Sequence, residues 1–102
     1  MWLNLAKQTN QSEKERVEKP IKDWLKSNNY YHFKVHGSAL MEEGIPDLIV
    51  CIKGLFLGIE AKDPKGKQSL SQKVHQQNIE NSGGIYILAK SLDDVIKIVK
   101  DL

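Results

Sequence analysis

The chain has 102 residues, of which 40% are hydrophobic and 27% charged, and its formal net charge at pH 7 is only +2. This length suits a single domain over residues 1–102 with one hydrophobic core, and the composition excludes a disordered chain. The small net charge excludes a protein that coats nucleic acid by overall basicity, so any contact with phosphate would have to come from local clustering of charge.

The N-terminus, residues 1–11, carries Trp2, Leu3 and Leu5 before the sequence becomes polar. We expect an N-terminal arm that is either partly ordered or packed against a sister subunit. It lacks the basic start and long apolar core of a signal peptide, and no apolar run approaches the ~18 residues of a membrane span. A cytoplasmic protein without membrane contacts is therefore expected.

Residues 12–27 show helical spacing of their apolar side chains, and Ser12 followed by Glu15 is typical of a capping box. Pro20 means that the helix either bends or begins there. Glu18 lies close to the apolar stripe. One interpretation of Glu18 is a solvated residue paired with Lys14 or Lys22 at i±4.

Residues 30–36 predict a strand with Tyr31, Phe33 and Val35 on one face. Its other face carries His32 and His36, which we interpret as surface residues and not as catalytic ones. A polar loop, residues 37–43, follows. Gly44 and Pro46 then indicate either a fixed approach of the backbone to a ligand or an ordinary tight turn.

Two apolar, β-branched-rich runs, residues 48–52 and 55–59, flank Lys53 and Gly54. This pattern predicts a β-hairpin between two largely buried strands. Cys51 lies inside the first run and is expected to be a reduced residue of the core.

A two-residue turn at 53–54 places Asp47 directly opposite Glu60, with their Cβ atoms roughly 4.5 to 5.5 Å apart. Like charges at this distance are destabilising, so a counter-charge is required. Lys62 shares the Glu60 face, whereas Ala61 turns to the other side. Carboxylate oxygens are the ligands that Mg²⁺ and Mn²⁺ prefer, and such an ion promotes hydrolysis by activating water. We therefore expect a divalent metal between the two acids.

The next loop contains Lys65 and Lys67, which would lie where a nucleic-acid backbone approaches the metal, unless they belong to an ordinary solvated loop. Ser69 then begins a helix to about residue 81, with Gln72 at the capping-box position and Lys73 beside it. The cap by itself is a sufficient structural explanation for Gln72. This helix has only a thin apolar side and is expected to be more exposed than the first.

Residues 85–89 predict a buried strand, and Ser91 begins a last helix with Asp93 and Asp94 in its first turn. The elements therefore follow the order α-β-β-β-α-β-α. This order predicts an α/β fold in which a mixed four-stranded sheet is flanked by helices.

The residues Pro46-Asp47 and Glu60-Ala61-Lys62 resemble the signature of the PD-(D/E)XK nuclease superfamily. The runs 44–47 and 58–62, with Ser69 and Gln72 before a helix, are most similar to the small stand-alone VRR-Nuc domains. The resemblance extends from about Glu18 to the C-terminal helix, and implies a restriction-endonuclease-like core.

The resemblance also implies roles for individual residues. Asp47, Glu60 and the Ala61 carbonyl would hold Mg²⁺ or Mn²⁺, and Glu18, or Glu15 in its place, would complete the site. Lys62 would position the attacking water. Gln72 would reach the scissile phosphate.

The function implied is that of a metal-dependent deoxyribonuclease which cuts branched DNA, such as Holliday junctions, as a homodimer. The sequence contains no GxSxG motif, no P-loop and no Cys/His spacing suited to zinc. The alternative from another class is a non-catalytic module for nucleic-acid binding or assembly.

Overall fold

The computed structural model describes residues 12–38 and 40–102. The predicted N-terminal arm, residues 1–11, lies outside the described residues. Seven elements follow one another in the predicted order: α2 (Glu13–Ser27), β1 (Tyr31–Lys34), β2 (Leu48–Ile52), β3 (Leu55–Ala61), α3 (Leu70–Asn81), β4 (Ile85–Ala89) and α4 (Leu92–Val99).

The four strands form one mixed sheet in the order β1-β2-β3-β4. Neighbouring strands among β1, β2 and β3 are antiparallel, whereas β4 is parallel to β3 and is reached through α3. Parallel neighbours require such a crossover connection. The predicted α/β fold with a mixed four-stranded sheet is confirmed.

Serine side chains begin all three described helices, as the sequence predicts. Ser12 and Ser91 each accept a hydrogen bond from a backbone amide in the first turn, and Ser69 forms a complete capping box with Gln72. Pro20 lies inside α2 without interrupting it. The helix therefore begins at Glu13 and not at the proline.

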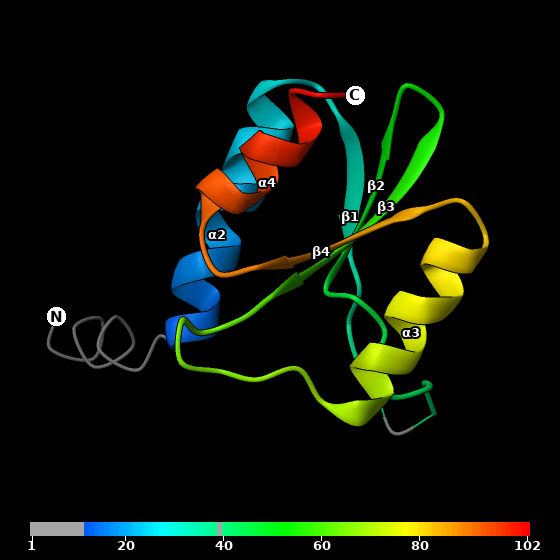
Figure 1. The fold of residues 1–102 in the computed structure, drawn as a ribbon. Helices are drawn as coiled ribbons and strands as arrows, with labels where there is room; N and C mark the ends of the chain where they lie inside the picture. Colours follow the sequence, from blue (N-terminus) through cyan, green and yellow to red (C-terminus); the bar gives the residue numbers. More distant parts are fainter. Residues whose placement is uncertain (1–11, 39) are drawn as a thin grey trace, which may run out of the picture.

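The helices lie on two sides of the sheet (Figure 1), with α2 and α4 packed together on one side and α3 on the other. The hydrophobic core lies between the sheet and the α2/α4 pair, where Ile21, Leu25 and Val95 are fully buried against β2, β3 and β4. Helix α3 has no buried residue, which confirms that it is the more exposed helix.

The turn between β2 and β3 consists of Lys53 and Gly54, whose φ angles are 53° and 80°. Positive φ at both positions is the signature of a type I′ turn, which matches the twist of a two-residue hairpin. The register pairs Ile52 with Leu55 and Leu48 with Ile59. The predicted hairpin and its register are confirmed.

Cys51 is exposed, so its predicted place in the core is wrong. Strand side chains alternate between faces, and the neighbours of Cys51, Val50 and Ile52, both point into the core. Cys51 pairs with Tyr31, and together with Phe33 these residues lie on the other face, where Tyr31 is 71% exposed. The sequence of β2 is apolar throughout, although only one face of the strand is buried.

No helix within residues 12–38 and 40–102 is long and apolar enough to span a lipid bilayer.

Candidate metal centre

Asp47 and Glu60 meet at the open end of the β2–β3 hairpin. Asp47 directly precedes β2, and the pairing of Leu48 with Ile59 carries the register on to Asp47 and Glu60. Glu60 is only 1% exposed, although it carries a carboxyl group. Because Ile59 and Ala61 belong to the core, alternation places Glu60 on the opposite face of β3, the face on which α3 lies.

The Lys14 ammonium bridges the two acids. Its Nζ lies 2.9 Å from Asp47 Oδ1 and 3.1 Å from Glu60 Oε2. Sequence reasoning missed this role and treated Lys14 only as a partner of Glu18. The sequence places Lys14 in the first turn of the predicted helix. It contains no local sign that this turn reaches the hairpin.

Asp47 is oriented by the backbone on both sides of it. Its Oδ2 accepts a hydrogen bond from the Ala61 amide at 2.9 Å, and its carbonyl accepts one from the Val35 amide at 2.7 Å. One carboxylate oxygen is thus held by the sheet, while the other contacts Lys14. The side chain is fixed before any ligand arrives.

Burial raises the pKa of Glu60 to about 7, and the nearby charge of Asp47 acts in the same direction. Lys14 partly offsets this through its charge and its hydrogen bond. For Lys14 itself, burial lowers the pKa, but its hydrogen bonds and charge interactions with Asp47 and Glu60 outweigh burial and leave the pKa raised. The two acids therefore stabilise the charged form of Lys14, and burial favours the protonated form of Glu60.

The two acids suit a divalent metal, because one oxygen from each converges on a single position that carries positive charge. Mg²⁺ is usually held by one or two carboxylates, with waters and substrate phosphates filling the other positions. Within residues 12–38 and 40–102, no three His, Cys, Asp or Glu side chains come together as a metal group. A metal at Asp47 and Glu60 would therefore need further ligands from the backbone, water or DNA.

Glu18 is buried, with 5% exposure, but its contacts lie away from this pair. Its carboxylate lies 2.6 Å from Lys34 Nζ and 3.8 Å from Lys22 Nζ. The predicted pairing of Glu18 with Lys22 at i+4 is confirmed. The predicted solvated environment of Glu18 is wrong, because the side chain is buried. Glu15, its proposed substitute, is exposed. No contact links either glutamate to Asp47 or Glu60 among the described residues, and their predicted metal role stays a prediction.

Lys62 and Gln72 are brought together at the start of α3. Lys62 Nζ donates to Gln72 Oε1 at 2.9 Å, and the same oxygen accepts from the Ser69 amide at 2.9 Å. The capping glutamine therefore also holds the lysine that follows the buried acid Glu60. This contact joins the end of β3 to the first turn of α3.

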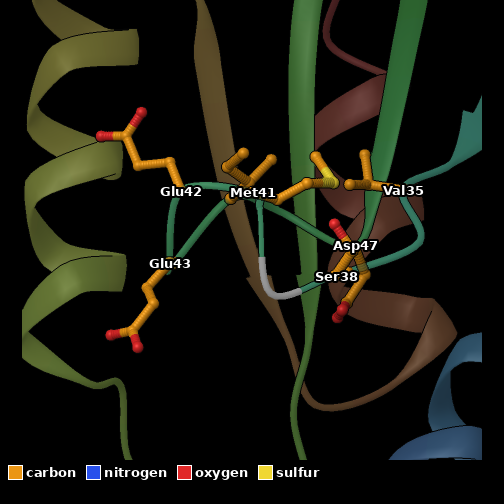
Figure 2. Close-up of a pocket in the computed structure, with 9 residues that line it drawn as sticks. Val35, Ser38, Met41, Glu42, Glu43 and Asp47 are labelled. Carbon is orange, nitrogen blue, oxygen red and sulfur yellow. The ribbon is translucent and has the colours of Figure 1, made fainter.

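The loop between β1 and β2 packs tightly against α3. Gly44 has a φ of +83°, and a Cβ there would lie 2.5 Å from the backbone carbon of Ser71. This close approach to protein backbone accounts for the glycine. Figure 2 shows Glu42 and Glu43 of this loop pointing toward α3, and Asp47 at the other side of a pocket of about 500 Å³.

The three lysines predicted to contact DNA are exposed. Lys65 and Lys67 lie in the loop between β3 and α3, and Lys73 lies in α3 close to its start. Lys65 is in a turn in which its amide donates to Asp63 Oδ1. His32, by contrast, makes a local contact of 2.8 Å between Nδ1 and the Tyr30 carbonyl.

No protein-family model matches the chain, and no curated protein matches it in sequence. A solved structure described as a VRR_NUC domain matches the fold with a TM-score of 0.71 and 22% sequence identity. The match covers 88% of this chain and 97% of that chain. At this identity the similarity concerns the fold.

Proposed function

We propose that this chain, which has the fold of a VRR_NUC domain, is a metal-dependent DNA endonuclease that hydrolyses phosphodiester bonds. The observation that carries the proposal is the convergence of Asp47 and Glu60 on one cation position. A pair of acids of which one, Glu60, is buried is costly unless a cation or a proton neutralises it. The adjacent Lys62 and Gln72 supply polar groups of the kind that phosphoryl chemistry uses.

In this proposal Asp47, Glu60 and the Ala61 carbonyl hold Mg²⁺ or Mn²⁺, with Glu18 contributing indirectly. The bound ion lowers the pKa of water and neutralises charge on the phosphoryl oxygens. Lys62 orients the attacking water, and Gln72 holds the Lys62 ammonium in place. Gln72 also lies at the start of α3, where backbone amides favour a phosphate group.

Lys65, Lys67 and Lys73 contact the DNA backbone in this proposal. All three are exposed and belong to the loop after β3 or to the first turn of α3, the same stretch of chain that carries Lys62 and Gln72. Contacts with phosphate position a duplex without reading its sequence. This arrangement suits an enzyme that recognises the shape of its substrate.

We propose branched DNA, with four-way junctions foremost, as the substrate. In this proposal each chain contributes a single metal site, at Asp47 and Glu60, so paired cuts in two strands require a homodimer. Tyr31, Phe33 and Phe56 lie on the face of the sheet opposite the α2/α4 core and are 71%, 48% and 46% exposed. Exposed aromatic side chains on this face support a contact with a second subunit. Light scattering at several protein concentrations tests whether the protein is a dimer. The cytoplasmic location stays a prediction.

The experiment for the activity is a cleavage assay with end-labelled linear, flapped and four-way DNA in Mg²⁺, Mn²⁺ or chelator. We expect metal-dependent cleavage that is strongest on the junction and is lost in Asp47→Asn and Lys62→Ala. Asp93→Asn is the matched control, because it removes an exposed carboxylate on α4. Equal loss in this control, or cleavage that persists in chelator, contradicts the proposal.

A non-catalytic module for nucleic-acid binding or assembly is the second candidate. It is favoured by one observation, namely that Lys14 already supplies the acids with a counter-charge. The same substrate panel separates the two candidates. Binding of the junction in chelator, without cleavage in either metal, supports the module.

A further inference from the structure

The Lys14 ammonium lies at the place where the oxygens of two carboxylates converge. It is 2.9 Å from Asp47 Oδ1 and 3.1 Å from Glu60 Oε2, while Asp47 Oδ2 is already bound to the Ala61 amide. The oxygens that contact Lys14 are therefore the ones from each acid that converge on a shared cation. A lysine ammonium is a compact point charge with three donors, and two of them suffice for this bridge.

Lys14 and a divalent ion cannot share this position. Mg²⁺ binds oxygen at roughly 2.0 to 2.1 Å, which is closer than the ammonium approaches either acid. A second positive charge a few ångströms from the ion would also repel it, and more strongly beside the buried Glu60 than in bulk water. Entry of the metal between Asp47 and Glu60 therefore requires Lys14 to leave.

Lys14 is placed so that it can leave without disturbing the fold. Its side chain is 40% exposed, compared with 1% for Glu60, and it extends from the first turn of α2. The residues that anchor α2 in the core begin with Val17, about one turn further along, and continue with the fully buried Ile21 and Leu25, about two and three turns along. A change of side-chain rotamer is sufficient to move the ammonium into solvent.

We propose that Lys14 is a resident counter-cation: it neutralises the acid pair in the metal-free protein and is displaced when the divalent ion binds. This inference rests on the proposed function for the presence of the ion. In this role Lys14 lowers the affinity for the metal, because the ion must displace it, and it neutralises Asp47 and Glu60 when no metal is bound. Metal binding and release of the lysine are then one coupled event.

The first test measures Mn²⁺ and Mg²⁺ affinity by titration calorimetry for the wild type, Lys14→Met and Lys19→Met. Methionine keeps the unbranched stem and removes the charge. Lys19 is the matched control, because it lies on the same helix in an exposed pair with Asp23. We expect Lys14→Met to bind metal at least about tenfold more tightly, since the ion no longer displaces a cation, and Lys19→Met to bind like the wild type.

The second test uses only the wild-type protein, so it does not depend on whether a variant folds. Acetylation of lysine side chains is followed by mass spectrometry with and without Mg²⁺. We expect Lys14 to become more reactive when the metal is present, because its ammonium moves into solvent. Lys97, which pairs with the exposed Asp93 on α4, serves as the internal reference.

The outcomes separate this inference from the proposed function. Metal binding that is equal or weaker in Lys14→Met, or Lys14 reactivity that does not rise with Mg²⁺, overturns the resident-cation role while the metal-dependent nuclease stands. If neither the wild type nor Lys14→Met binds a divalent ion, the metal site itself is overturned, and the displacement of Lys14 with it.

Discussion

Asp47 Oδ2 accepts a hydrogen bond from the backbone amide of Ala61 at 2.9 Å, across the mouth of the β2–β3 hairpin. This bond ties the carboxylate to the strand that carries Glu60, so the two acids move as one unit with the sheet. A ligand that bridges them meets a geometry that is already set. Such preorganisation is what electrostatic catalysis requires.

Replacing either acid by its amide should abolish cleavage while the fold is kept. In Asp47→Asn the amide oxygen can still accept the hydrogen bond from Ala61, so the sheet contact survives while the charge is lost. We expect the single-turnover cleavage rate to fall at least about a hundredfold for Asp47→Asn and for Glu60→Gln. Circular dichroism verifies the fold, and a variant that cuts at the wild-type rate would show that the acid takes no part.

The free energy of unfolding should decrease as the pH rises from about 4.5 to about 7 in metal-free protein. The pKa of Glu60 is raised from 4.5 to about 7 in the folded state, so over this range the folded protein binds more protons than the unfolded chain. The loss from this group is on the order of 3 kcal/mol. Urea unfolding at a series of pH values in chelator measures it.

Glu60→Gln is the variant that isolates this effect. At pH 8 it removes a buried charge and should be more stable than the wild type, whereas at pH 5 the two should be nearly equal because Glu60 is then protonated. A difference in stability that does not change between pH 5 and pH 8 would assign the pH dependence to other groups.

Divalent metal affinity should weaken as the pH falls below about 7. A proton on Glu60 competes with the ion for the same carboxylate, and burial favours the protonated form. Calorimetric titrations with Mn²⁺ between pH 5.5 and 8 measure the change in affinity and the protons released. Affinity that is constant over this interval would place the ion away from Glu60.

The two roles of Gln72 can be separated by comparing it with Ser69. Both side chains form the capping box of α3, but of the two only Gln72 contacts Lys62. Ser69→Ala and Gln72→Ala should each destabilise the protein by roughly 0.5 to 2 kcal/mol. We expect cleavage to fall clearly only in Gln72→Ala, as measured under single-turnover conditions. Equal activity in the two variants would show that Gln72 only caps α3 and has no role in cleavage.

Gly44→Ala should destabilise the protein and displace the loop between β1 and β2. Its positive φ costs any other residue about 1 to 2 kcal/mol, and the added Cβ would lie 2.5 Å from the Ser71 backbone, which cannot yield easily. Thermal unfolding measures the loss. Gly37→Ala is the matched control in the same loop, because a Cβ there meets nothing within 4 Å, and it should leave stability almost unchanged.

The hairpin, its register and the helix starts could be predicted from the sequence because they depend on neighbours along the chain. Lys53-Gly54 specifies a two-residue turn, and that turn places Asp47 opposite Glu60. The capping box of Ser69 and Gln72 likewise involves residues three positions apart. These features need no knowledge of the rest of the fold.

The exposure of Cys51, the contact of Glu18 with Lys34 and the bridge made by Lys14 were decided by tertiary structure alone. Each depends on which helix packs on which face of the sheet, and an apolar run or an isolated charge contains no such information. Lys14 and Glu60 are 46 positions apart, and they meet because α2 is docked by its buried Ile21 and Leu25. The sequence by itself determined that two acids would face each other; the packing of α2 decided which cation of the chain stands between them, because long-range contacts follow from the core and not from local pattern.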